Sequence, residues 1–357
     1  MNRARLGIVT ASAALLGAIV FALVSNGGTK VPLGSALSHD VRPGPGASET
    51  TRLSAYGDGL AGTPGDTTVY VLRGPVPGGT VLVLGGTHGN EIAGSVAAVV
   101  LVERARVTRG RLIVIPNANN SAVSYPDPVK PGPEWIEVES PSGTRRFKYG
   151  ARRTRPEHQG APDPERYRHP AAGEALAGNE GRNLARVFPG NADGTLTQRI
   201  AAAILRLVKD EQVTVVIDLH ENEPDSKLAW AIVAHPKNAG LADAARKRLE
   251  AEGLAMTLET SPRTPRGVSH LEIGEKTRAL TVLVETPNPG QATHPEHADV
   301  TNDPVLPLAK RVGAHLSALQ ALLNAHNATT SDEARVEVHD APSLADVMRD
   351  GVGRYLR

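Results

Sequence analysis

The sequence runs Val-Leu-Val-Leu-Gly-Gly-Thr-His-Gly-Asn-Glu from Val81 to Glu91. Its first four residues form a short apolar run bounded by glycine, which is typical of a buried strand. From Glu91 to Arg104, alanine and valine recur at helical spacing, so a helix is predicted directly after the glycine-rich turn. A strand that leads through a turn into a helix indicates an α/β domain, and open α/β sheets bind ligands at this edge.

The rest of the chain repeats this alternation of strand and helix. Further strands are predicted at 69–72, 111–115, 213–219, 228–234 and 281–284, and further helices at 197–208, 239–252 and 304–323. This order predicts an α/β fold, a single domain with a twisted, largely parallel mixed sheet flanked by helices. The segment 117–183 is rich in proline, glycine and arginine and is predicted to be irregular. Its stretch 145–155 holds six basic residues and no acidic one, which indicates either a solvated surface or a positive wall beside a site for anionic substrates.

The amino terminus carries a targeting signal. Arg3 and Arg5 precede an uncharged, mostly apolar stretch from Leu6 to Val24. We therefore expect an N-terminal apolar helix over residues 1–27, which is a signal peptide or a membrane anchor. No clear cleavage site follows, and this favours the anchor. The positive flank should stay in the cytoplasm, so the remaining chain should lie outside it, anchored to the membrane or secreted after cleavage.

Composition divides the remainder of the chain into three parts. Residues 28–65 are rich in glycine, proline, serine and threonine, and they are predicted to form a flexible linker. Residues 66–325 hold the predicted strands and helices and form the predicted folded domain. Residues 326–357 are left as a C-terminal tail.

The composition also excludes several classes of function. The formal net charge is +1, so no global field favours nucleic acid, and no such partner is expected. The chain contains no cysteine, which excludes disulfides, thiolate metal sites and a cysteine nucleophile. A serine hydrolase is not indicated, because residues 93–97 lack the second glycine of a Gly-x-Ser-x-Gly turn.

Two predicted strand ends carry side chains that suit a metal ion. His88 and Glu91 are three residues apart and can converge on one point, while the glycines between the strand and the helix let the backbone approach closely. His220 follows a second apolar strand, where Asp218 could accept the other N–H of its imidazole. Two imidazoles and one carboxylate leave a fourth position for water, as in catalytic zinc sites. We therefore expect one zinc ion on His88, Glu91 and His220.

A third strand ends in an acidic residue. Glu285 follows the apolar run Val-Leu-Val, and burying an unpaired carboxylate is costly. A carboxylate at this position therefore indicates a functional role. We expect Glu285 to act as the general base that takes a proton from water and passes it to a leaving nitrogen.

Together these motifs resemble the succinylglutamate desuccinylase and aspartoacylase branch of the zinc carboxypeptidase superfamily, over roughly residues 67–325. The resemblance implies a zinc carboxypeptidase-like fold, one zinc ion on the three residues named above and Glu285 as general acid and base. The run Arg-Asn-Leu-Ala-Arg that ends at Arg186 is similar to the substrate-binding run of the family. It implies that Arg186 binds a substrate carboxylate.

The same resemblance carries expectations for four further positions. Arg182 and Asn183 begin the substrate-binding run, and Arg182 is expected to help stabilise the oxyanion. Ala185 stands where relatives typically carry an asparagine that assists carboxylate recognition. His270 lies on the segment where relatives place a mobile active-site loop, and it would either contact the substrate or lie exposed in that loop.

Three functions remain open at this point. The first is a zinc-dependent deacylase that hydrolyses the amide bond of N-acyl amino acid type substrates. The second is an exported zinc carboxypeptidase that acts on peptides, including cell-wall peptides. In both cases the partner is a small molecule or short peptide that bears a carboxylate. The third is an inactive binding protein on the same fold, which the presence of all three ligands and the base disfavours.

Overall fold

The computed structural model describes residues 39–128, 132–172, 174–261, 266–293 and 298–357. The apolar helix predicted over residues 1–27, as signal peptide or anchor, lies outside these ranges, as does the first part of the predicted linker. Among the helices in the described ranges, none has the length and apolar character needed to cross a membrane.

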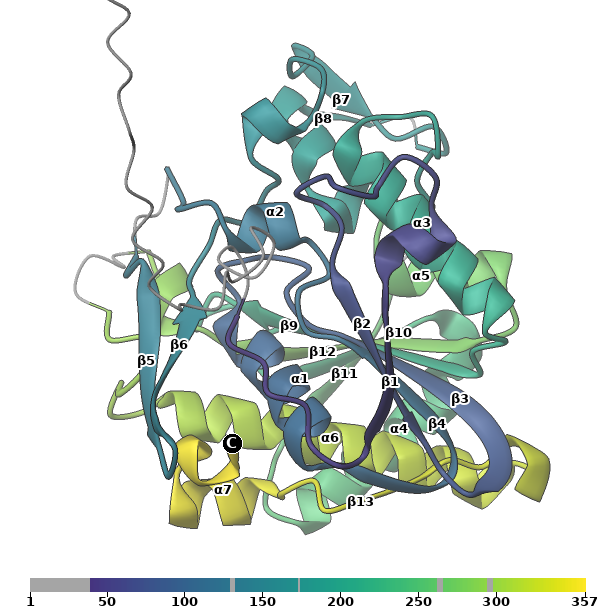
Figure 1. Cartoon of the computed structure of the whole chain (residues 1–357), viewed down its shortest axis with the longest axis vertical. Helices are drawn as coiled ribbons and strands as arrows, with labels where there is room; N and C mark the ends of the chain where they lie inside the picture. Colours follow the sequence, from purple (N-terminus) through teal and green to yellow (C-terminus); the bar gives the residue numbers. More distant parts are fainter. Residues whose placement is uncertain (1–38, 129–131, 173, 262–265, 294–297) are drawn as a thin grey trace, which may run out of the picture. The chain divides into compact units, whose positions relative to one another are not determined.

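Nine strands of the described chain form one mixed sheet (Figure 1). Their order is β1-β2-β4-β3-β9-β12-β10-β11, and β13 pairs with β4. The strands are β1 Ala47–Arg52, β2 Thr68–Arg73, β3 Val76–Leu84, β4 Arg106–Ile115, β9 Val215–Asn222, β10 Ala231–Ala234, β11 Thr257–Thr260, β12 Leu280–Pro287 and β13 Glu337–His339. The central strands β4, β3, β9 and β12 are parallel, whereas β1, β2 and β10 pair antiparallel with their neighbours toward the centre. The prediction of a single α/β domain with a largely parallel mixed sheet is confirmed.

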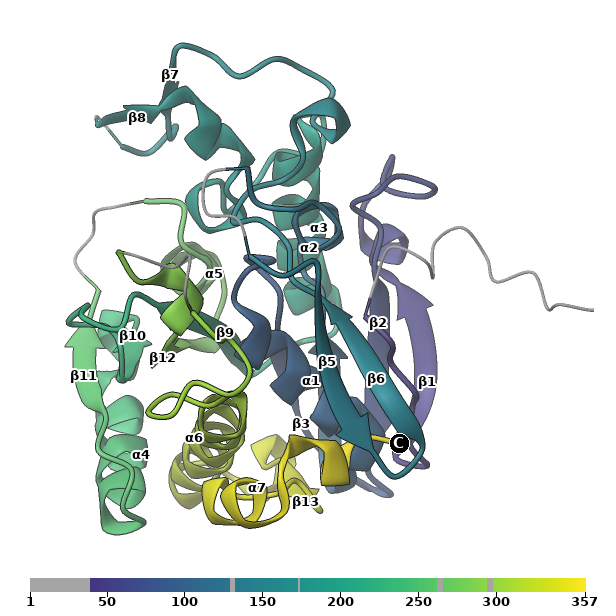
Figure 2. The ribbon, with the colours of Figure 1, turned by 90° about the vertical axis from the view of Figure 1, so that its left-hand side faces the viewer.

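Helices cover both faces of this sheet (Figures 1 and 2). On one face lie α1 Ile92–Arg104, α4 Ala239–Ala251 and α6 Leu308–Thr329, and on the other lie α3 Leu196–Asp210 and α5 Ser269–Lys276. Strand β3 shows how the sequence produces this arrangement. Val81 and Val83 pack in the hydrophobic cluster of α1 and α6, whereas Leu82 and Leu84 pack in the cluster of α3. Because both faces are buried, the strand is a continuous apolar run rather than an alternating one.

Two segments that we predicted to lie outside the domain are part of it. Residues 47–52 of the predicted linker form β1, which pairs antiparallel with β2. In the predicted tail, β13 pairs with β4, α7 Leu344–Asp350 follows, and Leu356 is buried. Strand β1 is a mostly exposed edge strand with the polar sequence Ala-Ser-Glu-Thr-Thr-Arg, so it is held by main-chain pairing and has no apolar pattern to reveal it.

The segment 117–183 is more ordered than predicted. It contains the short helix α2 Asn120–Val123 and two hairpins, β5–β6 and β7–β8, which stand apart from the main sheet (Figure 2). Their strands are β5 Trp135–Ser140, β6 Gly143–Lys148, β7 Arg166–Arg168 and β8 Ala175–Ala177. In the first hairpin only Ile136 and Phe147 are fully buried apolar side chains, so each strand offers too few apolar residues for a pattern to stand out.

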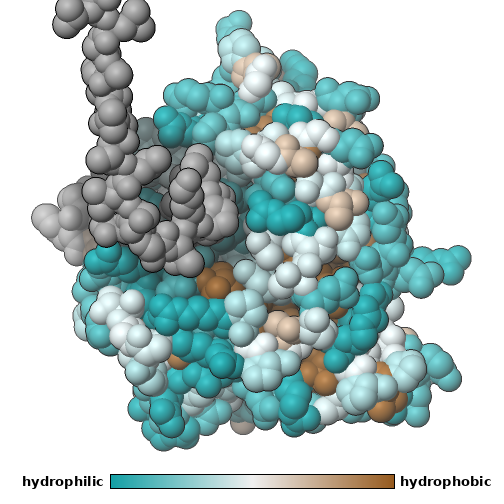
Figure 3. Space-filling view, viewed as in Figure 1, coloured by the Kyte–Doolittle hydropathy of each residue, from teal (hydrophilic) through white to brown (hydrophobic). Residues whose placement is uncertain are grey.

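The surface carries little apolar area on the side shown in Figure 3, where hydrophobic residues are scattered among hydrophilic ones. Of the described residues, the large hydrophobic side chains that are exposed are Val76, Val305 and Met348. They lie on β3, before α6 and on α7, and so they form no common patch. Isolated exposed apolar residues of this kind are normal for a folded domain.

Candidate active site

The three predicted metal ligands meet at the carboxyl ends of the adjacent parallel strands β3 and β9. His88 follows β3, Glu91 precedes the first residue of α1, and His220 lies near the end of β9. All three are buried, and one ligand atom of each lies within 4.8 Å of the others. The structure therefore brings together the residues that the two sequence motifs supply.

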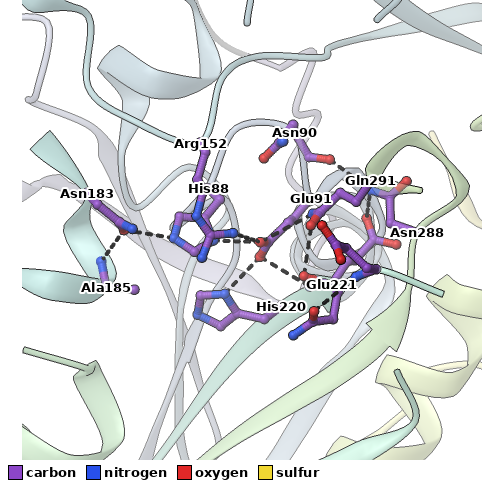
Figure 4. A network of polar contacts seen from close by, with 12 residues as sticks. His88, Asn90, Glu91, Arg152, Asn183, Ala185, His220, Glu221, Asn288 and Gln291 are labelled. Atoms are coloured by element: carbon purple, nitrogen blue, oxygen red, sulfur yellow. Dashed lines mark hydrogen bonds and ion pairs between the residues drawn. The ribbon is translucent and has the colours of Figure 1, made fainter. Parts of the chain in front are cut away.

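The carboxylate of Glu91 is shared by both imidazoles, as Figure 4 shows. Glu91 Oε1 lies 2.6 Å from His88 Nδ1, and Glu91 Oε2 lies 2.8 Å from His220 Nδ1. The main-chain N–H of Glu221 also donates to Oε2, at 3.1 Å. Burial alone would raise the pKa of Glu91, but the two imidazoles hold it well below its ordinary value. The carboxylate is thus anionic at the point where both rings converge.

The other ring nitrogen of each imidazole, Nε2, lies close to a side-chain oxygen. His88 Nε2 lies 2.9 Å from Asn183 Oδ1, and His220 Nε2 lies 3.1 Å from Asp218 Oδ2. Asp218 in turn accepts a hydrogen bond from Thr87 Oγ1 at 2.9 Å. The Asn183 oxygen beside Nε2 favours the His88 tautomer whose Nδ1 lone pair points at the shared site, which is how metal-binding histidines are commonly oriented. For His220, the Asp218 carboxylate lies within ion-pair distance of Nε2.

The donor set fits a divalent cation. Two imidazole nitrogens and one carboxylate oxygen are a common ligand set of catalytic zinc sites. The oxygen acceptors of Asn183 and Asp218 provide the outer support that such ligands need. The cluster of His88, Glu91 and His220 could therefore hold a metal ion.

Glu285 lies beside this cluster. On β12 it is in register with His220 of β9, and its side chain is 6% exposed. Its Oε2 has no hydrogen-bond partner in the described part of the chain. Burial raises the pKa of Glu285 to about 8. A buried carboxylate with an unused oxygen next to a candidate metal site is well suited to accept a proton.

The cluster opens into a cavity of about 240 Å³. His88, His220 and Glu285 line one part of it, and the guanidinium groups of Arg152 and Arg186 line another. The cavity thus joins the reactive cluster to two cations that suit an anionic group of a substrate.

The predicted substrate-binding residues Arg186 and Asn183 differ in their position relative to the cavity. Arg186 lines the cavity as expected, and burial followed by the neighbouring charge of Arg152 lowers its pKa. An anion between these two guanidiniums would relieve their repulsion. Asn183 is fully buried and contacts His88, so it supports a candidate ligand and does not line the cavity. Ala185 lines the cavity where the family resemblance led us to expect an amide.

Arg182 does not line the cavity. Its Nε lies 2.8 Å from Asp163 Oδ1, and its Nη1 donates to the main-chain carbonyl of Thr154 at 2.6 Å. These contacts engage the side chain with Asp163 and Thr154, which do not line the cavity. Arg152 occupies the cavity instead, and its Nη1 lies 3.4 Å from Glu91 Oε1.

Arg152 belongs to the basic stretch 145–155, which offered the only sequence signal for it. The other five basic residues pair with carboxylates that do not line the cavity: Arg145 with Glu103, Arg146 with Glu137, Lys148 with Glu134, Arg153 with Glu180 and Arg155 with Glu157. The positive wall suggested by the sequence is therefore reduced to one residue of that stretch.

His270 does not lie in an exposed loop. It is in α5, it is 2% exposed, and its Nε2 lies 2.5 Å from Ser261 Oγ. Burial lowers the pKa of His270 to about 3, so the ring that lines the cavity is neutral. The sequence did not reveal α5 because its eight residues contain only two apolar side chains, Leu271 and Ile273.

Glu221 is a supporting residue that the sequence did not single out. It follows His220, and alternation along β9 turns it to the opposite face. There it forms a buried ion pair with Arg311 of α6 and accepts the N–H of Ala93 at 2.9 Å. Glu221 thereby fixes the start of α1 and the helix α6 against the strand that carries a candidate ligand.

Comparison with known proteins finds similarity to solved structures. The chain matches no family model and no curated protein. It is similar to the solved structure of a succinylglutamate desuccinylase from Silicibacter sp. TM1040, with 20% identity and a TM-score of 0.46, over 78% of this chain and 64% of that one. An aspartoacylase family protein from Mesorhizobium loti gives 22% identity and a TM-score of 0.42, over 72% of this chain and 61% of that one.

A metallo-carboxypeptidase from Burkholderia cenocepacia gives 13% identity and a TM-score of 0.49, over 80% of this chain and 66% of that one. The chain thus spans less than two thirds of the length of all three solved proteins. The solved structures that match therefore include members of the succinylglutamate desuccinylase and aspartoacylase group and a metallo-carboxypeptidase, the groups that the sequence motifs resemble.

Proposed function

We propose that this chain is a zinc-dependent hydrolase that cleaves an amide bond close to a carboxylate, as in N-acyl amino acids. One observation carries the proposal. His88, Glu91 and His220 converge within 4.8 Å, next to Glu285 with its unpartnered oxygen, and the cluster opens into a cavity with two guanidinium groups. Each part of amide hydrolysis then has a residue to perform it.

His88, Glu91 and His220 would hold the metal. A zinc ion bound there supplies Lewis acidity, which polarises a carbonyl oxygen and makes a water molecule more acidic. The remaining work belongs to the chain. Asn183 and Asp218 keep the two imidazoles oriented, and the buried ion pair of Glu221 and Arg311 keeps the strand and helices in place.

Glu285 transfers the proton. It accepts one proton from water while the water oxygen bonds to the carbonyl carbon, and it then delivers this proton to the leaving nitrogen as the C–N bond breaks. The products are a carboxylate and an amine. A raised pKa suits this role, because the protonated form must persist long enough to donate.

Arg186 and Arg152 hold the substrate. A planar guanidinium binds a carboxylate through two hydrogen bonds, which suits Arg186 for the substrate carboxylate. Arg152 lies nearer the cluster, 3.4 Å from Glu91, and is placed to stabilise negative charge on the carbonyl oxygen. It takes the role that we had assigned to Arg182.

A carboxypeptidase is the second candidate. Ala185 brings a small apolar side chain to the cavity at a position where the family resemblance implies an asparagine. Fewer polar groups than the resemblance implies are then present to bind a carboxylate, and this favours a peptide. An inactive binding protein is disfavoured, because a buried carboxylate is costly when one oxygen has no partner among the described residues, and such a group is retained where it has a use.

The test is hydrolysis by the purified full chain loaded with zinc, with N-acyl amino acids and short peptides as substrates. We expect cleavage of one class, loss of activity with a chelator, and at least about a tenfold lower kcat/KM when the substrate carboxylate is amidated. His220→Ala should lower the zinc content measured by elemental analysis. Full zinc loading without hydrolysis of either class would leave only the binding-protein function.

We also propose that the catalytic domain lies outside the cytoplasm. Arg3, Arg5 and the apolar stretch after them would carry the catalytic domain out of the cytoplasm. A reporter fused after Gly28 should then be active only outside the cytoplasm. A fusion that is active only inside would contradict this topology.

A further inference from the structure

The cavity has an apolar side that the proposed chemistry does not use. Leu228, Val233, Val268 and Leu283 line this side. Val233 and Leu283 are each 6% exposed and pack in a small cluster that is separate from the two main hydrophobic cores. Apolar side chains that line a cavity beside reactive groups are typical of a binding pocket for part of a substrate.

The sheet register places this apolar side next to the reacting groups. Leu283 and Glu285 are two residues apart on β12, so their side chains share one face and stand about 7 Å apart along the strand. Leu283 lies directly opposite Val233 of β10. A side chain on the amino acid that carries the scissile nitrogen would reach this floor while the amide lies beside Glu285.

The same row of side chains ends in a carboxylate. Val233 of β10 is in register with Glu259 of β11, and both line the cavity. Glu259 is exposed, and its carboxylate forms no hydrogen bond or ion pair with the side chain of another described residue. The row Leu283, Val233, Glu259 therefore leads from an apolar floor to a free negative charge at the rim.

The cavity thus has three chemically different parts. Arg152 and Arg186 supply positive charge on one side, the floor is apolar, and Glu259 supplies negative charge at the rim. On the basis of the proposed function, we propose that the leaving amino acid carries a long aliphatic side chain with a terminal amine, as in lysine or ornithine. Arg186 binds its α-carboxylate, Leu283 and Val233 pack against its methylene groups, and Glu259 pairs with its ammonium group. An acidic side chain would bring a second negative charge onto the apolar floor and toward Glu259, which is unfavourable.

Binding of free amino acids to the zinc-loaded full chain, measured by calorimetry, tests this pocket without turnover. Lysine, norleucine and glutamate share an α-carboxylate and differ in the end of the side chain. We expect lysine to bind at least tenfold more tightly than glutamate and several-fold more tightly than norleucine. Glu259→Gln should lower the affinity for lysine to that for norleucine and leave norleucine unchanged.

Two variants complete the test. Glu252→Gln removes another exposed carboxylate, which pairs with Arg248 and does not line the cavity, and it should leave all three affinities unchanged. Leu283→Asn keeps the size of the side chain but makes the floor polar, so lysine and norleucine should both bind more weakly. If that variant does not fold, the comparison at the exposed Glu259 remains decisive.

The outcomes separate the pocket from the reaction. Equal affinity for glutamate and lysine, or a ratio of lysine to norleucine that Glu259→Gln does not change, would overturn the inference. Preferred lysine binding without hydrolysis of N-acyl lysine by the zinc-loaded chain would support the pocket and contradict the proposed function.

Discussion

The two ends of helix α1 each hold a buried glutamate, and their surroundings differ. At the carboxyl end, both oxygens of Glu103 accept hydrogen bonds from the fully buried Arg145, at 3.1 and 2.7 Å. The main-chain N–H groups of Arg42 and Arg357 also donate to Glu103, and Arg145 Nε reaches Asp40 at 2.8 Å. The buried charges of Glu103 and Arg145 are therefore paired with each other and hydrogen-bonded.

At the amino end, the charges are not balanced in this way. Glu91 contacts two imidazoles, while the neighbouring Glu285 keeps one oxygen without a partner in the ranges that the structure describes. Buried charges that only stabilise a fold are paired and hydrogen-bonded, because an unpaired one is destabilising. The difference between the two ends therefore separates a structural cluster, which closes the fold over its C-terminal residue, from a cluster with capacity left for a reaction.

Glu285→Gln should give the largest effect. The amide keeps the shape of the side chain but cannot accept a proton, so kcat should fall by about 100- to 10,000-fold. Zinc content and unfolding temperature should stay close to those of the original protein, whereas Glu91→Gln should lose zinc. Side-by-side measurement of zinc and kcat is the check. If Glu285→Gln loses the metal or retains near-normal turnover, Glu285 is not the base.

Glu103→Gln removes a buried charge from the structural cluster at the carboxyl end of α1. It leaves Arg145 buried with a weakened partner, and removal of one member of a buried pair costs about 3–5 kcal/mol, so the free energy of unfolding in urea should fall by an amount approaching this range. The folded fraction should still bind zinc. Glu137→Gln removes the carboxylate of an exposed pair with Arg146 and should cost less than about 1 kcal/mol. Equal losses in the two variants would contradict the structural role.

Asp218→Asn probes the support behind a candidate ligand. The carboxylate lies 3.1 Å from His220 Nε2, and loss of such a partner typically weakens metal binding by about 10- to 100-fold. Competition with a chromogenic chelator measures this change. Asp163→Asn removes a carboxylate that pairs with Arg182 outside the cavity, so zinc affinity should not change. An Asp218 variant with unaltered zinc affinity would show that His220 needs no support.

The smallest expected effect is the change of folding stability with pH. His39 lies next to Asp40 of the structural cluster, and burial lowers its pKa to about 3. The folded protein keeps the ring neutral, while the unfolded chain takes up a proton as the pH falls through about 6.5. Stability is therefore complete above pH 6.5 and is lost progressively toward pH 3. At pH 5.5 the loss is about 1.4 kcal/mol for this group.

His39→Asn tests whether the buried, neutral His39 causes the loss of stability as the pH falls. Asparagine Oδ1 can replace His39 Nδ1 as acceptor of the Lys148 N–H, which lies at 3.1 Å. The difference in unfolding free energy between pH 7.5 and pH 5.5 should then shrink by about 1.4 kcal/mol. His339→Asn, which removes an exposed imidazole, should leave the difference unchanged. A pH dependence that is identical in the His39 variant and the original protein would show that this ring does not control it.

The sequence predicted those parts of the site that follow from local pattern. His88, Glu91, His220 and Glu285 each stand at or just beyond an apolar run, and parallel strands bring their carboxyl ends to one edge. The strands and helices with apolar runs were found for the same reason. These are the features in which a few neighbouring residues already determine the position of a side chain.

The missed features depend on contacts between distant segments. Arg182 and Arg152 look alike in the sequence, but Arg182 contacts Asp163 and the Thr154 carbonyl, whereas Arg152 lines the cavity. Strand β1 is defined by its pairing with β2, and its own side chains are mostly polar and exposed. Local patterns carry no information on such partners, so these predictions could not succeed.

The alternation along β12 restricts how this site can evolve. Leu283 and Glu285 face the cavity, while Val284 between them is fully buried in the core on the other face of the sheet. Insertion or deletion of one residue in the strand would turn the carboxylate into the core and the valine into the cavity. Substitutions at Leu283 can change substrate preference one step at a time while Glu285 stays in place. In descendants of this chain, the strand should therefore vary in composition but keep a constant length.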